Sequence, residues 1–192
     1  MDNIAKFLFE TGMLQNIPRS GLFFLGSGNQ SVAEHTHRAS IIAYILMLNS
    51  SEVVDESKLL KMIIFHDFFE SRIGDLNWVN HKYVNVDIKK VLEEISNDYP
   101  FSDELVSLIK EFESQQTYES KIANDADQLE FLLTLKTQID IGNKNAEDWV
   151  SSIIDRLHTQ TAKDIAIEIF QTNYDEWWFS DKNDKYWSNR DS

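Results

Sequence analysis

Interruptions of the helical pattern are rare in this chain, and this scarcity limits its fold more than any other feature. Six glycines and two prolines are spread over 192 residues. Between them, most segments repeat their apolar residues with the period of a helix and not with the alternation of a strand. The pattern therefore predicts an all-α fold, built as one compact helical bundle.

The expected helices lie at residues 2–15, 31–49, 57–72, 84–97, 102–113, 117–141, 146–156 and 160–178. Ser31 and Glu34 have the spacing of a capping box and mark the start of the second helix. The segment 117–141 is either one helix or two. We assign residues 1–180 to a single helical domain and residues 181–192 to a polar C-terminal tail.

Composition argues against several classes of protein. The net charge of −14 argues against a nucleic acid polymer as partner, because such binding depends on Lys and Arg that neutralise phosphates. No apolar run approaches the ~20 residues of a membrane span, and the first residues do not have the pattern of a secretory signal. Without cysteine there are no disulfides or thiolate metal sites, and we expect a cytoplasmic protein.

The segment 59–70, LLKMIIFHDFFE, places His66, Asp67 and Glu70 in a run that is otherwise almost wholly apolar. A helix that is apolar nearly all round is buried, and an unpaired buried carboxylate is costly. On a helix Glu70 lies one turn beyond the other two groups, so all three can face one cavity. Taken alone, the His-Asp pair favours an internal hydrogen bond as the explanation.

Two other apolar helices begin with similar groups. His35 lies near the start of SVAEHTHRASIIAYILML, and Asp125 and Asp127 lie near the start of the apolar part of KIANDADQLEFLLTL. Imidazole nitrogens and carboxylate oxygens from three helices are ligands for Zn²⁺, Mn²⁺, Fe²⁺ or Co²⁺. We therefore predict a metal site built from His35, His66, Asp67 and an aspartate near 127, whose cation offsets the buried negative charge.

These motifs, in this order, resemble the HD superfamily of metal-dependent phosphohydrolases. SVAEHTHRAS, HDFFE followed by IGDL, and EFESQQTYESKIANDADQLE are similar to the 5′-deoxynucleotidases and their eukaryotic HD-domain relatives, over about residues 4–140. The resemblance implies an HD-type helical hydrolase domain that binds one divalent ion of Mn, Co, Zn, Fe or Mg. It also implies hydrolysis of (deoxy)nucleoside 5′-monophosphates to nucleoside and phosphate.

The resemblance assigns the metal ligands to His35, His66, Asp67 and Asp127. It prefers Asp127 because the ligand of the family motif stands directly before x-L, whereas periodicity does not decide between this residue and Asp125. The latter is then a supporting residue or a helix cap.

The resemblance also assigns roles around the metal. Glu70 matches a catalytic acidic residue, Asp75 matches a residue that contacts the nucleotide sugar and takes part in catalysis, and Arg19 matches an arginine that binds the substrate phosphate. Several members have a tryptophan directly after this arginine that helps to reject ribonucleotides. Ser-Gly-Leu follows here at residues 20–22, which leaves open a preference for 2′-deoxy substrates.

Other interpretations compete with this one. The chain could hydrolyse a cyclic or modified nucleotide, or it could be a non-catalytic helical module in which a metal only joins three helices. Tyr174, Trp177, Trp178 and Phe179 could form a partner-binding face, the seam of a homodimer or part of the core, and core or dimer packing is favoured. A second segment, His37-Arg38, either supports the site or is exposed.

Overall fold

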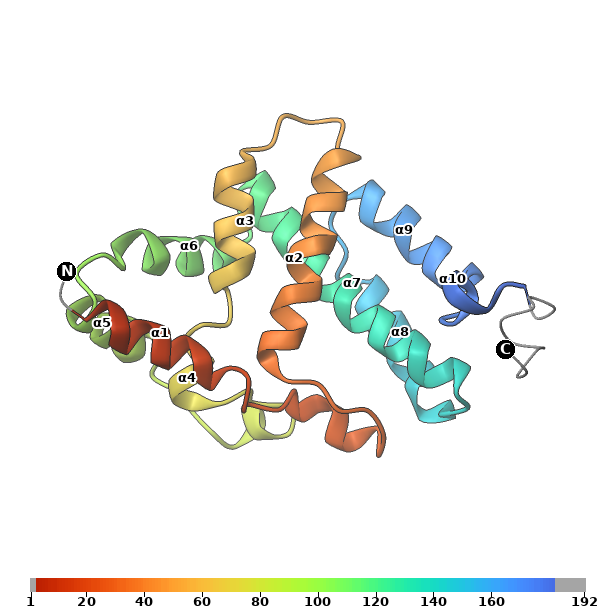
Figure 1. Cartoon of the computed structure of the whole chain (residues 1–192), viewed down its shortest axis with the longest axis horizontal. Helices are drawn as coiled ribbons and strands as arrows, with labels where there is room; N and C mark the ends of the chain where they lie inside the picture. Colours follow the sequence, from red (N-terminus) through yellow and green to blue (C-terminus); the bar gives the residue numbers. More distant parts are fainter. Residues whose placement is uncertain (1–2, 182–192) are drawn as a thin grey trace, which may run out of the picture.

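The computed structural model describes residues 3–181, and every regular element within them is a helix (Figure 1). This confirms the all-α prediction; the only β-type pairing among these residues is an isolated bridge between Pro18 and Ser31. The helices are α1 (Ile4–Met13), η1 (Ser20–Phe24), α2 (Val32–Leu48), α3 (Glu56–Phe65), α4 (Glu70–Ile73), η2 (Asn80–Lys82), α5 (Ile88–Asp98), α6 (Asp103–Ser114), α7 (Tyr118–Asp140), η3 (Lys144–Ala146), α8 (Glu147–Ile154), α9 (Gln160–Gln171) and α10 (Glu176–Phe179). None of them has both the length and the apolar character needed to cross a bilayer.

Helix α7 is the centre of the bundle. It is one continuous helix of 23 residues, which decides the question that its sequence left open. Its start is fixed by a capping box formed by Thr117 and Ser120. It packs against α2, α3, α6, α8 and α9 (Figure 1), so side chains near its start lie where several helices converge.

Helix α2 begins as predicted and turns one face into the bundle. The side chain of Ser31 accepts a hydrogen bond from the backbone of Glu34, whose carboxylate in turn accepts one from the Ser31 backbone. Val32, His35 and Ala39 lie on the buried face at helical spacing. The same periodicity that buries the apolar residues therefore carries His35 into the interior.

The prediction of one helix over 57–72 is wrong. Helix α3 ends at Phe65, and α4 begins only at Glu70. Between them the backbone hydrogen bonds join residues three positions apart instead of four. Phe68 N–H donates to Phe65 O at 3.0 Å, and Glu70 N–H donates to Asp67 O at 3.0 Å. Tertiary packing overrides helix propensity here, because the turn buries Phe68 and Phe69 in a second group of apolar side chains.

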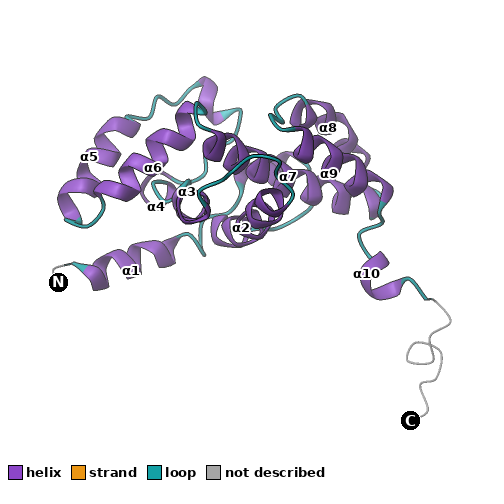
Figure 2. Ribbon diagram, turned by 90° about the horizontal axis from the view of Figure 1, so that it is seen from above, coloured by secondary structure: helices purple, strands orange, loops and turns teal. Residues whose placement is uncertain are grey.

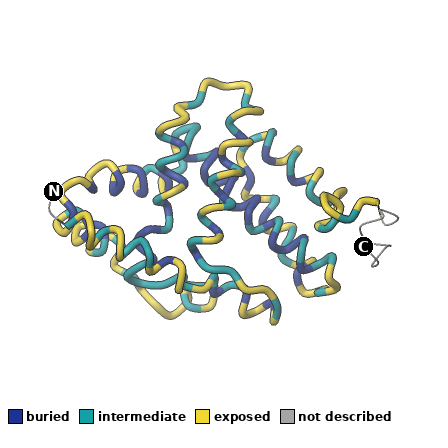
Figure 3. The backbone as a smooth tube through the Cα atoms, in the orientation of Figure 1, coloured by how far each residue is buried: buried dark blue, intermediate teal, exposed yellow. Residues whose placement is uncertain are grey.

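Figure 3 shows where along the backbone the residues are buried, and the buried apolar side chains form two groups, a first core and a second core. The first core is formed mainly by α2, α3, α7, α8 and α9. The second core is formed by the turn 66–69 with α5 and α6, and Phe7 of α1 packs against it. Helix α6 contributes to both cores, and the turn that carries His66 and Asp67 lies at their junction.

The C-terminal helix is shorter than predicted. Helix α9 ends at Gln171 instead of 178, and Figure 2 shows the separate α10 set apart from the other helices. Tyr174, Trp177 and Trp178 are all exposed. Of the alternatives predicted for them, packing in this chain's own core is therefore wrong. Of the expected polar tail, only Asp181 lies within the described residues.

Candidate active site

Histidine and carboxylate side chains from three parts of the chain meet near the start of α7. His35 Nε2 of α2 lies 3.0 Å from Asp127 Oδ1 of α7 and 3.7 Å from Asp67 Oδ2 of the turn. His66 Nε2 lies 3.1 Å from the same Asp67 oxygen. The structure thus brings together the four residues that the sequence predicts as metal ligands.

The chemistry of this group suits a divalent metal ion. His35 Nε2 and His66 Nε2 are buried and have no hydrogen-bond partner among the described residues. Ligand atoms of these two histidines and of Asp127 all lie within 4.8 Å of one another, so these three residues can hold an ion. Asp67 contacts both histidines but lies outside that closest set.

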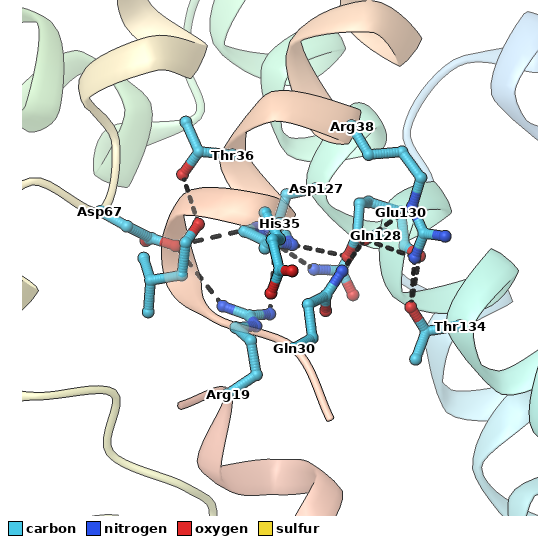
Figure 4. Close-up of polar contacts among 12 residues, drawn as sticks. Arg19, Gln30, His35, Thr36, Arg38, Asp67, Asp127, Gln128, Glu130 and Thr134 are labelled. Carbon is cyan, nitrogen blue, oxygen red and sulfur yellow. Dashed lines mark hydrogen bonds and ion pairs between the residues drawn. The ribbon is translucent and has the colours of Figure 1, made fainter. Parts of the chain in front are cut away.

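Glu130 supports His35 from behind. One carboxylate oxygen lies 2.6 Å from His35 Nδ1, while the other accepts hydrogen bonds from Gln30 at 2.6 Å and from Arg38 at 2.8 Å (Figure 4). Burial acts to raise the pKa of Glu130, but the hydrogen bond with His35 and the charge of Arg38 outweigh it and lower the pKa. The interaction directs His35 Nε2 towards Asp127 and Asp67.

The sequence reasoning gave no role to Glu130. The available signal was its place three residues after Asp127, which puts both carboxylates on one side of α7. Arg38 supports the site through Glu130, whereas its neighbour His37 is exposed.

Asp125 lies away from the histidines although it is only two residues from Asp127. Its carboxylate accepts hydrogen bonds from the backbone of His158 at 2.7 Å and from the backbone and hydroxyl of Thr159 at 2.8 and 2.6 Å. Thr159 is the N-cap of α9. Asp125 therefore joins α7 to the start of α9 and does not contact the site.

Arg19 lies over the acidic side of the group. Its guanidinium is 3.4 Å from Asp67 Oδ2 and 4.0 Å from Asp127 Oδ1. Burial acts to lower the pKa of Arg19, but the two carboxylates raise it, so the side chain carries a fixed positive charge. The chain as a whole has a net charge of −14, but the positive charge of Arg19 lies beside the histidines and can attract an anionic group to them.

Glu70 and Asp75 complete the acidic side chains around the site. Burial, with the charges of Asp67 and Asp75, raises the pKa of Glu70 to about 10, and Glu70 Oε2 has no hydrogen-bond partner. Asp75 Oδ2 accepts a hydrogen bond of 2.7 Å from the Ser20 backbone, and the Ser20 hydroxyl donates to the Asp75 carbonyl at 2.7 Å. Ser20 thus fixes the position of Asp75.

A cavity of about 750 Å³ adjoins these residues. Arg19, Asp75 and Asp127 belong to its lining, so the site is continuous with a space large enough for a small molecule. The remaining wall comes from η1, the segment 76–81, α7 and α8.

Comparison with known proteins places the chain in context. Residues 11–168 match the model of the HD domain family. The 5′-deoxynucleotidase HDDC2 of Danio rerio is 27% identical over 139 residues, covering 69% of this chain and 68% of that protein. The 5′-deoxynucleotidase hdd1 of Schizosaccharomyces pombe is 28% identical over 142 residues, covering 68% of this chain and 69% of that protein. A conserved hypothetical protein of Pyrococcus furiosus shares the fold, with a TM-score of 0.73 and 23% identity over 88% of this chain and 99% of that one.

Proposed function

The chain belongs to the HD domain family and is a phosphohydrolase of that family, and from this we propose that it hydrolyses (deoxy)nucleoside 5′-monophosphates to nucleoside and phosphate. The observation that carries the proposal is the cavity lined by Arg19, Asp75 and Asp127 beside the two buried histidines. The names of the relatives from Danio rerio and Schizosaccharomyces pombe point to the same substrate class.

In this proposal His35, His66, Asp67 and Asp127 hold one divalent ion of Mn, Co, Zn, Fe or Mg. The distances among these side chains support the assignment. An ion held there would supply positive charge for the phosphoryl oxygens and an activated water for the attack. Glu130 keeps His35 in the orientation that ligation requires.

Arg19 binds the phosphate of the substrate. Its guanidinium lies against Asp67 and Asp127 and lines the cavity. The planar guanidinium can donate two parallel hydrogen bonds to phosphate oxygens, which orients the phosphorus for attack as well as binding it.

Glu70 acts as the general acid. Burial and the neighbouring carboxylates raise the pKa of Glu70, which favours the protonated carboxyl group, and its Oε2 has no hydrogen-bond partner and is available for proton transfer. Water attacks phosphorus and the bond to the 5′-oxygen breaks. The 5′-oxygen takes the proton of Glu70, and the proton released by the attacking water returns to the Glu70 carboxylate. The nucleoside leaves as a neutral alcohol.

Asp75 binds the sugar. Because one of its oxygens accepts the hydrogen bond from Ser20, the other is available to accept one from the 3′-hydroxyl. The residues that follow Arg19 are Ser20, which points its hydroxyl at the Asp75 carbonyl, and Gly21, which has no side chain. With no bulky group at these positions, we expect ribonucleotides to be accepted together with deoxyribonucleotides.

Phosphate release from a panel of deoxy- and ribonucleoside 5′-monophosphates tests the proposal, with Mn²⁺, Co²⁺, Zn²⁺ and Mg²⁺ each added to metal-stripped protein. We expect turnover with at least one ion and loss of both metal binding and turnover in Asp67→Ala. Full activity of metal-free Asp67→Ala protein would exclude the mechanism. Cyclic and modified nucleotides are assayed in parallel by chromatographic loss of substrate, because opening a cyclic phosphate releases no phosphate. Activity confined to these would favour another HD phosphohydrolase, and a metal-loaded protein inert on all substrates would favour the non-catalytic module.

A further inference from the structure

Arg156 of the segment after α8 differs from the other described arginines. Arg19, Arg38 and Arg72 each form an ion pair with a carboxylate. Within residues 3–181, no carboxylate oxygen lies within 4.0 Å of the Arg156 guanidinium; its Nε donates to the Ser152 carbonyl at 3.0 Å and its Nη1 to Gln128 Oε1 at 3.2 Å. The Arg156 side chain is exposed, so its remaining donors are accessible to a bound molecule.

Gln128 links this arginine to the site. Its Nε2 donates a hydrogen bond of 2.8 Å to Asp127 Oδ2, and its Oε1 accepts the hydrogen bond from Arg156. Both ends of the buried amide are therefore in use, and the amide orients Arg156. Since a guanidinium has five N–H groups, Arg156 keeps donors for another molecule.

Arg156 lines a cavity that has several aromatic side chains in its wall. Phe131 and Trp149 form a ring pair with centroids 6.1 Å apart and pack against the first core. Phe24 and Trp78 also line the cavity and are exposed. Flat apolar surfaces of this kind suit a flat ring, and stacking on aromatic side chains is a common way to bind nucleobases.

We propose that Arg156 recognises the base of the substrate and that the site prefers guanine nucleotides, an inference that rests on the proposed function. Guanine presents two acceptors, O6 and N7, on one edge, and a guanidinium donates to both at once. Adenine carries an amino donor where guanine has O6, so the same arginine meets a donor there. Gln128, which also lines the cavity, acts as a positioning residue for Arg156.

The first test compares phosphate release from dGMP and dAMP by the wild-type protein, Arg156→Ala and Arg156→Lys. We expect wild-type kcat/KM to favour dGMP by about tenfold or more, and Arg156→Ala to lose this preference by lowering the dGMP value alone. Arg156→Lys should recover only part of it, because an ammonium does not reproduce the fork of a guanidinium. Lys163→Ala, an exposed change on α9 outside the cavity lining, is the matched control and should leave both values unchanged.

Equal loss with both nucleotides in Arg156→Ala, or no loss with either, would overturn the assignment. Circular dichroism checks that the variants are folded.

The second test needs no hydrolysis. Calorimetric titration with deoxyguanosine and deoxyadenosine should show tighter binding of deoxyguanosine by the wild-type protein and about equal, weak binding by Arg156→Ala. If this pattern appears while no nucleotide releases phosphate, the base site stands and the proposed phosphatase function fails. If phosphate is released but the wild-type protein binds both nucleosides alike, or neither of them, the phosphatase function stands and the base site fails.

Discussion

At the scale of single residues, the candidate site depends on the contacts of Glu130 as much as on the proposed metal ligands. Glu130 is fully buried, and both of its oxygens are used by His35, Arg38 and Gln30. A carboxylate in this position fixes which nitrogen of His35 carries a proton and leaves Nε2 free to act as a ligand.

Glu130→Gln keeps the shape of the side chain but removes its charge. We expect the affinity for Mn²⁺ or Co²⁺ to fall about 10- to 100-fold, because the amide holds His35 in the ligating orientation less well. Calorimetric titration of metal-stripped protein measures the change. Glu147→Gln, an exposed change at the start of α8, is the control and should bind as the wild type does. Unchanged affinity in Glu130→Gln would mean that His35 does not need this support.

Glu70→Gln separates chemistry from metal binding. The amide has no acidic proton to give, so we expect kcat to fall at least about 100-fold while the metal affinity stays within about threefold of the wild-type value. Steady-state kinetics and metal titration on the same preparation measure both. A variant with wild-type kcat would remove Glu70 from the reaction.

The sequence pointed to the histidines and aspartates of the candidate site because these residue types do not suit an apolar environment. His35, His66, Asp67 and an aspartate near 127 stood out as ionisable groups in apolar segments, whereas the choice of Asp127 over Asp125 came from the resemblance to the HD superfamily. Gln128 and Arg156 did not stand out, because an uncharged amide and a lone arginine are ordinary on helices. Their contact joins residues far apart in the sequence, and such a pairing depends on how α8 packs on α7.

At the scale of helices, starts were predicted better than ends. Ser31 shows the start of α2 through a local hydrogen bond that the sequence reveals. The ends of α3 and α9 have no glycine or proline to mark them, and packing of Phe68 and Phe69 in the second core decides the first of these ends. Such long-range causes cannot be read from local periodicity.

Helix α1 is attached to the second core by Glu10, which offers a test at this scale. Its carboxylate accepts hydrogen bonds from Arg72 at 2.6 and 3.1 Å, from Ser71 at 3.0 Å and from the Tyr99 hydroxyl. Burial acts to raise the pKa of Glu10, but these hydrogen bonds outweigh it and lower the pKa below its usual value of 4.5. The charged form is therefore favoured more strongly in the folded protein than in the unfolded chain.

Glu10→Gln should lower the free energy of unfolding at pH 7 by about 1–3 kcal/mol. A lowered pKa stabilises the fold above the unfolded value, and this stabilisation is lost as the pH falls through the lowered pKa. The difference between variant and wild type should therefore shrink below pH ~4.5, as urea unfolding at pH 7 to 3 would show. Glu93→Gln, which removes an exposed pair with Lys89, is the control and should cost less than about 0.5 kcal/mol. A pH-independent difference would contradict this account of Glu10.

At the scale of the whole molecule, a bound ion would connect parts of the chain that are far apart in sequence. His35 belongs to α2, His66 to the turn after α3, and Asp127 to α7. A ligand that binds only the folded state raises its stability by mass action.

Addition of Mn²⁺ or Co²⁺ at about 100 times its dissociation constant should raise the Tm of metal-stripped protein by about 5–10 °C. Thermal unfolding followed by circular dichroism measures this, and a chelator should reverse it. Asp127→Ala should show no such rise. An equal rise in this variant would indicate that the stabilising ion binds somewhere else.

The junction of the two cores has a consequence for how this molecule can change. His66 and Asp67 share one short turn with Phe68 and Phe69, whose side chains anchor the second core. A substitution in α5 or α6 that changes the size of a side chain packed there would shift Phe68 and Phe69. The shift would reach His66 and Asp67 although neither residue is altered. Transfer of the candidate site to another scaffold would therefore require transfer of the second core as well.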